Sequence, residues 1–309
     1  MSDRDDSLTR RAALKCLAYG GAGTLFVLSS GVLTPVDLAT ASEKTAVGTP
    51  LFVQISDTHI GFNKEANPDV GSTLRQAIAR VNTLRTAPGL VLHTGDITHL
   101  SKATEFDTAA ELLKDLHAGE LHTVPGEHDV ADATVSEYFA RFGKASGKRG
   151  YYSFDYRGVH FVGLINVLNF QPGGLGALGH EQLEWLEDDL KGRTSSTPLV
   201  VFAHMPLWTV YQPWGWGTAD AEPALANLRR FGSVTILNGH IHQIVQKTEG
   251  NITFHTARST AYPQPAPGQG PGPGPMKVPA GELLNVLGIT NATLVRHPRA
   301  LTLADSTLA

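Results

Sequence analysis

The amino-acid sequence predicts an α/β layered domain with a binding site at the carboxyl ends of its strands. From Thr49 onward, short apolar runs alternate with segments whose apolar residues recur at helical spacing. Such alternation is typical of sheets covered by helices. Five of the apolar runs end in an acidic residue or a histidine. Because ligands bind at the carboxyl ends of strands in such sheets, these side chains mark the candidate site.

Five runs of apolar and β-branched residues are predicted to form buried strands. They cover residues 51–55, 90–92, 121–124, 199–202 and 234–238. Two amphipathic helices are predicted between them, over 74–84 after the N-cap Ser72 and over 106–116 after Thr104. Strands and helices therefore alternate along the first half of the chain.

The middle of the chain predicts a hairpin, with strands over 151–156 and 159–164 joined by a tight turn, followed by a helix over 181–190. Between the hairpin and this helix, residues 174–179 fit the template Gly-x-Gly-x-x-Gly. No strand runs directly into this stretch, as a dinucleotide-binding turn requires. We interpret it as a flexible loop.

The segment Pro263–Pro275 holds six prolines and four glycines in thirteen positions. This composition excludes a regular helix or a central strand and predicts an extended surface loop. The tail beyond it predicts a helix over 283–287 and a strand over 292–295. We expect the loop and the tail to belong to one domain that covers residues 42–309.

Residues 1–41 have the pattern of a targeting segment. The twin arginines Arg10 and Arg11 precede a moderately apolar stretch over 14–33, and residues 39–41 offer an Ala-x-Ala cleavage site. The segment resembles a twin-arginine export signal, which implies the export machinery as a partner and a periplasmic or exported protein with no stable membrane span after cleavage. The alternative is a membrane anchor that stays uncleaved, because the apolar stretch has near-spanning length.

The net charge and the cysteine count exclude one class of partner and one source of stability. The chain of 309 residues carries a formal charge of −4 and has no basic stripe, so we expect no binding of duplex nucleic acid. The single cysteine, Cys16, excludes an intrachain disulfide. A 41% hydrophobic share is ordinary for a soluble globular protein.

The candidate ligands repeat one spacing. His240 and His242 follow the strand over 234–238, and Asp57 and His59 follow the strand over 51–55. Residues i and i+2 of an extended segment point the same way, so each pair can present two ligands to one point. Asp96, His128 and His204 follow the remaining three strands. Imidazole and carboxylate together favour zinc, manganese or iron.

A carboxylate can bridge two ions about 3.5–4 Å apart, and such a pair generates hydroxide near neutral pH and neutralises charge in phosphoryl transfer. The residues also resemble the calcineurin-like metallophosphoesterase superfamily. Its motifs Asp-x-His, Gly-Asp, Gly-Asn-His-Asp, a lone His and Gly-His-x-His occur in order over residues 50 to 260, the third as Gly-Glu-His-Asp. The resemblance implies a four-layer α/β/β/α sandwich of two mixed sheets flanked by helices.

The resemblance also implies roles, motif by motif. The first metal would be held by Asp57, His59 and His242, with Asp96 as the bridging ligand, and the second by Glu127, His204 and His240. His128 would protonate the leaving oxygen or position the phosphate, and Asp129 would pair with it and raise its pKa. A hydroxide that bridges two ions of manganese, iron or zinc would then attack phosphorus in line.

Glu127 departs from the family pattern, which usually has asparagine at this position. We expect Glu127 to bind the second metal and to weaken the attraction for a phosphate dianion. One alternative is that the side chain turns aside and water fills its place. Another alternative is that Glu127 impairs the site and the protein is not catalytically active.

Two further features stand near the predicted ligands. Trp208, Tyr211, Trp214 and Trp216 form an aromatic segment after His204 that predicts either a stacking wall for a substrate or a small satellite core. His93 and His99 flank Asp96, either as hydrogen-bond partners that orient the ligands or as histidines without a role.

Together these observations predict an exported hydrolase of phosphate esters with two metal ions. We expect a small-molecule substrate and favour a phosphodiester, either a cyclic nucleotide or another organic diester. One alternative is a phosphomonoesterase or protein phosphatase on the same site. The other is a metal-binding protein of the cell envelope without catalysis.

Overall fold

The computed structural model describes residues 24–29, 32–37, 50–130, 135–147, 149–296 and 299–309. The chain divides into two compact units, 1–49 and 50–309. In the first unit, β1 (Thr24–Ser29) pairs antiparallel with β2 (Val32–Asp37). The twin arginines and the cleavage site of the predicted export signal lie outside the described residues. No helix in the described part of the chain combines the length and the apolar character that a membrane crossing requires.

The second unit contains two mixed sheets. The six-stranded sheet has the order β10-β11-β9-β8-β7-β6 and the five-stranded sheet the order β13-β12-β3-β4-β5. The first sheet consists of β6 (Tyr152–Tyr156), β7 (Val159–Gly163), β8 (Leu199–Phe202), β9 (Val234–Asn238), β10 (Gln246–Glu249) and β11 (Ile252–Thr256). The second consists of β3 (Phe52–Ile55), β4 (Leu90–His93), β5 (Glu120–Thr123), β12 (Gly288–Arg296) and β13 (Arg299–Thr307). Strands β3, β4 and β5 run parallel, as do β7, β8, β9 and β11.

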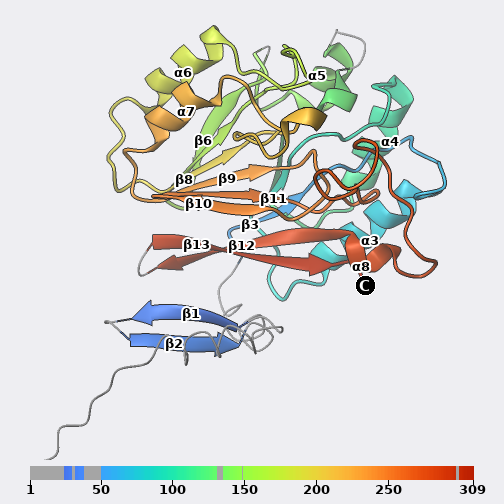
Figure 1. The fold of residues 1–309 in the computed structure, drawn as a ribbon, viewed down its shortest axis with the longest axis horizontal. Helices are drawn as coiled ribbons and strands as arrows, with labels where there is room; N and C mark the ends of the chain where they lie inside the picture. Colours follow the sequence, from blue (N-terminus) through green and yellow to red (C-terminus); the bar gives the residue numbers. More distant parts are fainter. Residues whose placement is uncertain (1–23, 30–31, 38–49, 131–134, 148, 297–298) are drawn as a thin grey trace, which may run out of the picture. The chain divides into compact units, whose positions relative to one another are not determined.

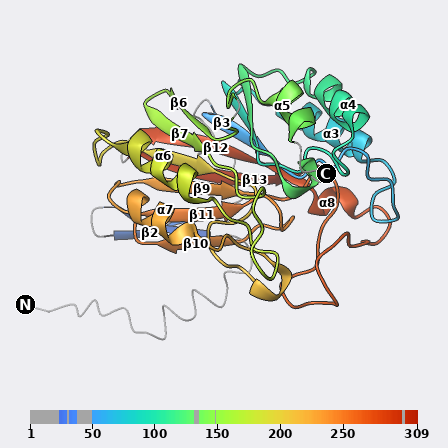
Figure 2. The same cartoon turned by 90° about the horizontal axis from the view of Figure 1, so that it is seen from above.

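Helices cover the outer faces of both sheets. They are α3 (Val70–Asn82), α4 (Ala103–Leu113), α5 (Ser136–Phe142), α6 (His180–Leu190), α7 (Ala221–Leu228) and α8 (Leu283–Val286). In both views α3, α4 and α5 lie toward one end of the unit, and α6 and α7 lie toward the other (Figures 1 and 2). The apolar sides of α6 and α7 pack on the six-stranded sheet, and α3 packs on the five-stranded sheet.

Alternation along the strands produces the layers. In β3, Phe52 points into the core between the sheets, whereas Val53 and Ile55 face Ala77 of α3. In β8, Val200 and Phe202 also enter the core between the sheets, and its other two residues face α6 and α7. Strands buried on both faces read as continuous apolar runs, because each face meets a different layer. The predicted four-layer α/β/β/α sandwich is confirmed.

Most predicted elements are present, and two helix starts are wrong. The hairpin of β6 and β7 turns through Arg157 and Gly158, which both have positive φ, as two-residue hairpins prefer. The N-cap of α3 is Asp69, whose Oδ1 accepts a hydrogen bond from Ser72 N at 2.9 Å, so Ser72 belongs to the first turn. Helix α4 begins at Ala103, which places Thr104 inside it.

The loops and the tail follow the sequence prediction in part. Residues 263–275 contain neither helix nor strand. Residues 174–179 are also a loop, in which Gly176 N donates to Gly217 O at 3.0 Å. The tail forms α8 and β12 as expected, and β13 adds an edge strand that the sequence analysis did not predict.

Candidate metal centre

The strand order brings all the predicted ligands to one edge. Asp57 and His59 follow β3, Asp96 follows β4, and the 3-10 turn Glu127–Asp129 follows β5. His204 follows β8, while His240 and His242 follow β9. The carboxyl ends of parallel strands meet at one edge of a sheet, and the two sheets pack face to face. The seven predicted metal ligands and His128 therefore converge, although they span 186 positions of the chain.

An unusual backbone conformation aims these side chains. Asp57, His59, Asp96, His240 and His242 all have positive φ, between 43° and 69°. Outside glycine such angles cost about 1–3 kcal/mol each, and they persist where the surroundings enforce them. Here the turns are tied together by hydrogen bonds from Asp57 N to Gly95 O at 3.0 Å and from His59 N to Asp96 O at 2.9 Å. The fold thus maintains strain in order to place the ligands.

The first group of ligands is Asp57, His59 and His242, all buried. The Nε2 atoms of the two histidines lie 3.2 Å apart, and His242 Nε2 lies 3.3 Å from Asp57 Oδ1. His242 donates its Nδ1–H to Tyr262 O at 2.6 Å. Since the carbonyl only accepts, this bond fixes the tautomer and leaves the lone pair on Nε2, the atom that faces the group.

The second group is Glu127, His204 and His240. Glu127 Oε2 lies 2.8 Å from His204 Nε2, and Glu127 Oε1 lies 2.8 Å from His240 Nδ1. His204 donates its Nδ1–H to Thr94 O at 2.7 Å, so Nε2 is the ring nitrogen that faces the group. The long side chain of Glu127 turns toward these histidines and not aside.

Asp96 lies between the two groups. Its Oδ2 is 3.5 Å from His59 Nε2 in the first group and 3.4 Å from His204 Nε2 in the second. Its other oxygen accepts a hydrogen bond from His128 N at 2.9 Å. One carboxylate that faces both groups is the arrangement that a bridging ligand requires.

Buried polar atoms that lack a hydrogen-bond partner indicate whether these side chains fit metal ions. Buried atoms without a hydrogen-bond partner include Asp57 Oδ2, Glu127 Oε2, His204 Nε2 and both ring nitrogens of His240. The 2.8 Å contacts of Glu127 therefore lack the alignment of hydrogen bonds. A buried polar atom without a partner costs about 1–3 kcal/mol, and cations would satisfy these atoms. Imidazole and carboxylate suit zinc, manganese and iron, so the residues fit a pair of such ions.

The electrostatics agree with a cation site. Burial would raise the pKa of the Glu127 carboxyl, yet His240 and His204 hold it well below its usual range. Burial together with the neighbouring His242 and His128 holds the pKa of His59 well below its usual range, so its ring is neutral and able to act as a ligand. For His204, burial is outweighed by Asp96 and Glu127, which raise its pKa well above the usual value.

No hydrogen bond or ion pair joins the side chains of Asp129 and His128, although the charge of Asp129 contributes to the raised pKa of His128. Both Asp129 oxygens are engaged by the N–H groups of Gly126, Ile97 and Thr98 at 2.8–3.0 Å and by the Thr98 hydroxyl at 2.9 Å. Burial and Asp96 raise the pKa of Asp129 to about 6, against the effect of these donors. His128 instead donates its Nδ1–H to His99 O at 2.7 Å. Asp129 therefore fastens the turn after β5 to the turn after β4.

A pocket of about 240 Å³ opens above the ligands. Its lining includes the ligands Asp96, Glu127 and His240 together with His128, and also Phe62, Tyr262, Trp214, Trp216 and residues 273–275. The aromatic segment therefore contributes both to a wall of the pocket and to a small core, the two roles that the sequence left open. Trp214 and Trp216 line the pocket, whereas Trp208 packs against Phe254 with ring centroids 4.8 Å apart. The Pro/Gly-rich loop contributes to the wall.

The sequence left the role of His93 open and gave no indication of Tyr262. His93 is buried, with Nε2 3.2 Å from the Thr58 hydroxyl and Nδ1 accepting from Gly95 N at 3.3 Å, so it braces the turns and does not reach the pocket. Tyr262 was not predicted. It orients His242 and stacks on His59 with ring centroids 4.8 Å apart, but no strand or motif directly precedes it to signal this role.

Comparisons with known proteins agree with this geometry. Residues 50–244 match the family model described as calcineurin-like phosphoesterase. The chain is 28% identical over 163 residues to a probable glycerophosphodiester phosphodiesterase of Arcobacter nitrofigilis, covering 51% of this chain and 58% of the relative. It is 26% identical over 215 residues to a 3′,5′-cyclic-nucleotide phosphodiesterase of Nostoc, covering 68% of this chain and 77% of the relative.

A solved structure is similar to the whole fold. A dimetal phosphatase from Danio rerio superposes with a TM-score of 0.62 at 16% identity, covering 84% of this chain and 97% of the other. This likeness extends to both sheets and their helices, beyond the residues that the family model matches.

Proposed function

Because the chain belongs to the calcineurin-like phosphoesterase family, we propose that it hydrolyses organic phosphodiesters with two metal ions. The position of Asp96 between two groups of buried ligands supports this proposal most strongly. Asp57, His59 and His242 would hold one ion, and Glu127, His204 and His240 the other. When bound, the ions supply an acidified water and neutralise charge on the phosphoryl group.

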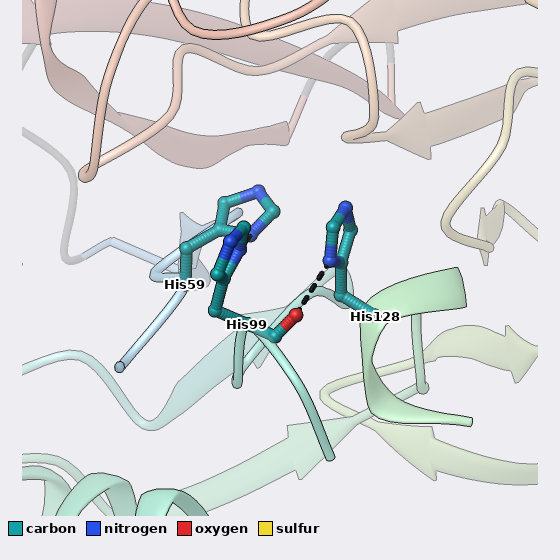
Figure 3. A group of neighbouring side chains, drawn as sticks. All are labelled: His59, His99 and His128. Atoms are coloured by element: carbon teal, nitrogen blue, oxygen red, sulfur yellow. Dashed lines mark hydrogen bonds between the residues drawn. The ribbon is translucent and has the colours of Figure 1, made fainter. Parts of the chain in front are cut away.

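His128 is the proposed proton donor to the leaving oxygen. Its Nδ1–H is committed to His99 O, and Nε2 lies on the opposite edge of the ring (Figure 3). The ring lines the pocket beside Asp96 and Glu127. Burial is outweighed by these two carboxylates, which raise its pKa above the usual value, so the protonated form extends to higher pH. Such a group would assist the departure of a poor leaving group.

Charge supports a diester over a monoester. Glu127 adds a third carboxylate to Asp57 and Asp96 at the site. Compared with asparagine, this lowers the formal charge of a site with two divalent ions by one, which weakens attraction for a monoester dianion more than for a diester monoanion. Lys64 is the one Lys or Arg side chain among the lining residues that the structure describes. The two named phosphodiesterase relatives agree with this preference.

The shape of the pocket supports an organic substituent on the phosphorus. Trp214 is half-buried and Trp216 is buried, and both line the same pocket as the ligands, with ring centroids 5.0 Å apart. Aromatic walls of this kind stack on bases or pack on apolar groups. Cyclic nucleotides and other diesters with a flat or apolar group are the substrates that this wall would bind.

The experiment compares a chromogenic phosphodiester with the matching monoester. The purified protein is loaded separately with manganese, zinc or iron, with Asp96→Asn as the control for contaminating activity. Diester turnover that disappears in the control supports the proposal. Monoester preference would replace it with a phosphatase function, and bound metal without any turnover would indicate a metal-binding protein.

Export rests on the sequence of residues 1–41 alone. We propose that the twin arginines direct the chain through the twin-arginine route to the periplasm or beyond. A protein that folds and loads metal before it crosses the membrane would suit this route. Unchanged location after Arg10→Lys combined with Arg11→Lys would refute the route.

A further inference from the structure

The loop after β4 surrounds His128, and His99 is at its centre. The hydroxyl groups of Ser101 and Thr98 donate to His128 O at 2.8 Å and 3.3 Å. The carbonyl of His99 accepts from His128 Nδ1 at 2.7 Å. Together with the bond from His128 N to Asp96 Oδ1, the loop fixes the backbone of His128 and one ring nitrogen. The bond at Nδ1 restricts rotation of the ring, and a group that packs on the face of the ring restricts it further.

The side chain of His99 packs on the face of the His128 ring and so supplies a second constraint. Its ring lies nearly parallel to that of His128, with centroids 4.9 Å apart and an interplanar angle of 15°. Phe62 supports His99 from behind, edge to face, with centroids 5.2 Å apart. His59 meets both rings edge to face, with centroids 4.7 Å from His128 and 5.6 Å from His99. Figure 3 shows the three imidazoles gathered around the hydrogen bond from His128 to His99 O.

We propose that His99 is a positioning residue, whose ring holds the imidazole of His128 so that Nε2 faces the phosphoester. This inference rests on the proposed function, because His128 is the proton donor there. His99 also reaches His59, with their Nδ1 atoms 3.5 Å apart, the outer limit of a hydrogen bond. That contact is weaker than the stacking, so the principal effect of His99 falls on proton donation.

The proposal separates two kinds of substrate. A nitrophenolate leaves readily without a proton, whereas an alkoxide needs one, so misplacing His128 slows only the second kind of reaction. General acid catalysis contributes about 10²–10⁴-fold. A partly misplaced donor should lose part of this, about 10- to 100-fold in kcat. Damage to the fold or loss of metal would instead slow the hydrolysis of both substrates equally.

Three substitutions test the contact. His99→Ala removes the ring, His99→Phe restores a ring that can stack, and His99→Asn restores a polar group without a ring. The matched control is His117→Ala, on the exposed turn after α4. Each protein is measured with an alkyl and a nitrophenyl phosphodiester, alongside metal content, melting temperature and the ring signals of His128 in NMR spectra.

We expect His99→Ala and His99→Asn to lower kcat about 10- to 100-fold on the alkyl diester and less than about 3-fold on the nitrophenyl diester. His99→Phe should recover most of the loss. The His128 signals should broaden or multiply in His99→Ala and His99→Asn, which lack a ring, and stay sharp in His99→Phe. Equal losses on both substrates, no loss, or an unchanged His128 ring in His99→Ala would overturn the proposal. Wild-type protein that hydrolyses neither diester would refute the proposed function instead, and the NMR comparison would still decide whether His99 orders His128.

Discussion

Among the described residues, two clusters built around buried histidines and carboxylates differ in whether the ring nitrogens have hydrogen-bond partners. At the metal centre, His204 Nε2 lies 2.8 Å from Glu127 and 3.4 Å from Asp96, yet it has no hydrogen-bond partner. On the six-stranded sheet, both nitrogens of the buried His160 are satisfied, by Asp155 at 2.9 Å and Asp189 at 2.7 Å. Since buried polar atoms in folded proteins are almost always paired, the first cluster fits a cation-binding site and the second is a complete structural network.

The backbone shows the same difference. His160 lies within the regular strand β7, and Asp189 lies within α6. The ligands of the metal centre instead follow strand ends, and five of them have positive φ. Strain and unsatisfied atoms together distinguish a functional cluster from a structural one, because a merely structural network has no reason to retain either. Burial and residue type alone would not separate the two.

The largest effect should come from Asp96→Asn, which keeps the shape of the side chain but removes the bridging charge. We expect turnover to fall by about 10²–10³-fold, the loss typical of removing one group that stabilises transition-state charge. Steady-state kinetics measure this, with Asp107→Asn on the surface of α4 as the matched control. If Asp96→Asn retained more than a tenth of the activity, the bridging role would be wrong.

The converse change, His160→Ala, should affect stability and leave catalysis alone. It leaves the largely buried Asp189 carboxylate without its ring partner, for a loss of about 3 kcal/mol in the free energy of unfolding. Asp155 is 62% exposed and contributes little to this loss. Denaturant titration measures the change. A fall in kcat with full metal content would mean that the two clusters are not independent.

Glu127→Asn sharpens the comparison within the metal centre. The carboxylate reaches both His204 and His240 at 2.8 Å, so its removal should weaken retention of the second ion about 10- to 100-fold. Metal content after dialysis against a graded chelator measures retention. Relative activity toward the monoester should rise in the same variant. Unchanged metal content would show that Glu127 is not a ligand.

The smallest predicted effect on catalysis comes from Trp214, which lines the pocket. Trp214→Ala should raise KM about 2- to 10-fold for a diester with an aromatic substituent, since one aromatic contact contributes about 0.5–1.5 kcal/mol. A dialkyl diester should change less. Trp185→Ala, which removes a tryptophan of α6 that packs against Tyr151, is the control. Equal changes for both substrates would argue against a stacking wall.

The sequence was sufficient to predict the strands that end in ligands and the seven residues that converge. Their motifs are local, because a strand, its turn and its ligand lie within a few residues of one another. The hydrogen-bond partners of His128 could not be predicted from the sequence. Asp129 is its neighbour in the chain, but the Asp129 oxygens accept hydrogen bonds from the N–H groups of Ile97 and Thr98. Tyr262 and residues 273–275 approach the site from loops whose paths follow no periodic pattern. Strand β13 pairs with the preceding strand β12 as an antiparallel hairpin, which the sequence analysis did not predict.

The central claim is that two ions bind on either side of Asp96 and that none binds at His160. Anomalous diffraction from crystals of the manganese-loaded protein tests it most directly. The account predicts two peaks, one among Asp57, His59 and His242 and one among Glu127, His204 and His240. A single peak, peaks remote from Asp96, or a peak at the His160 cluster would contradict it.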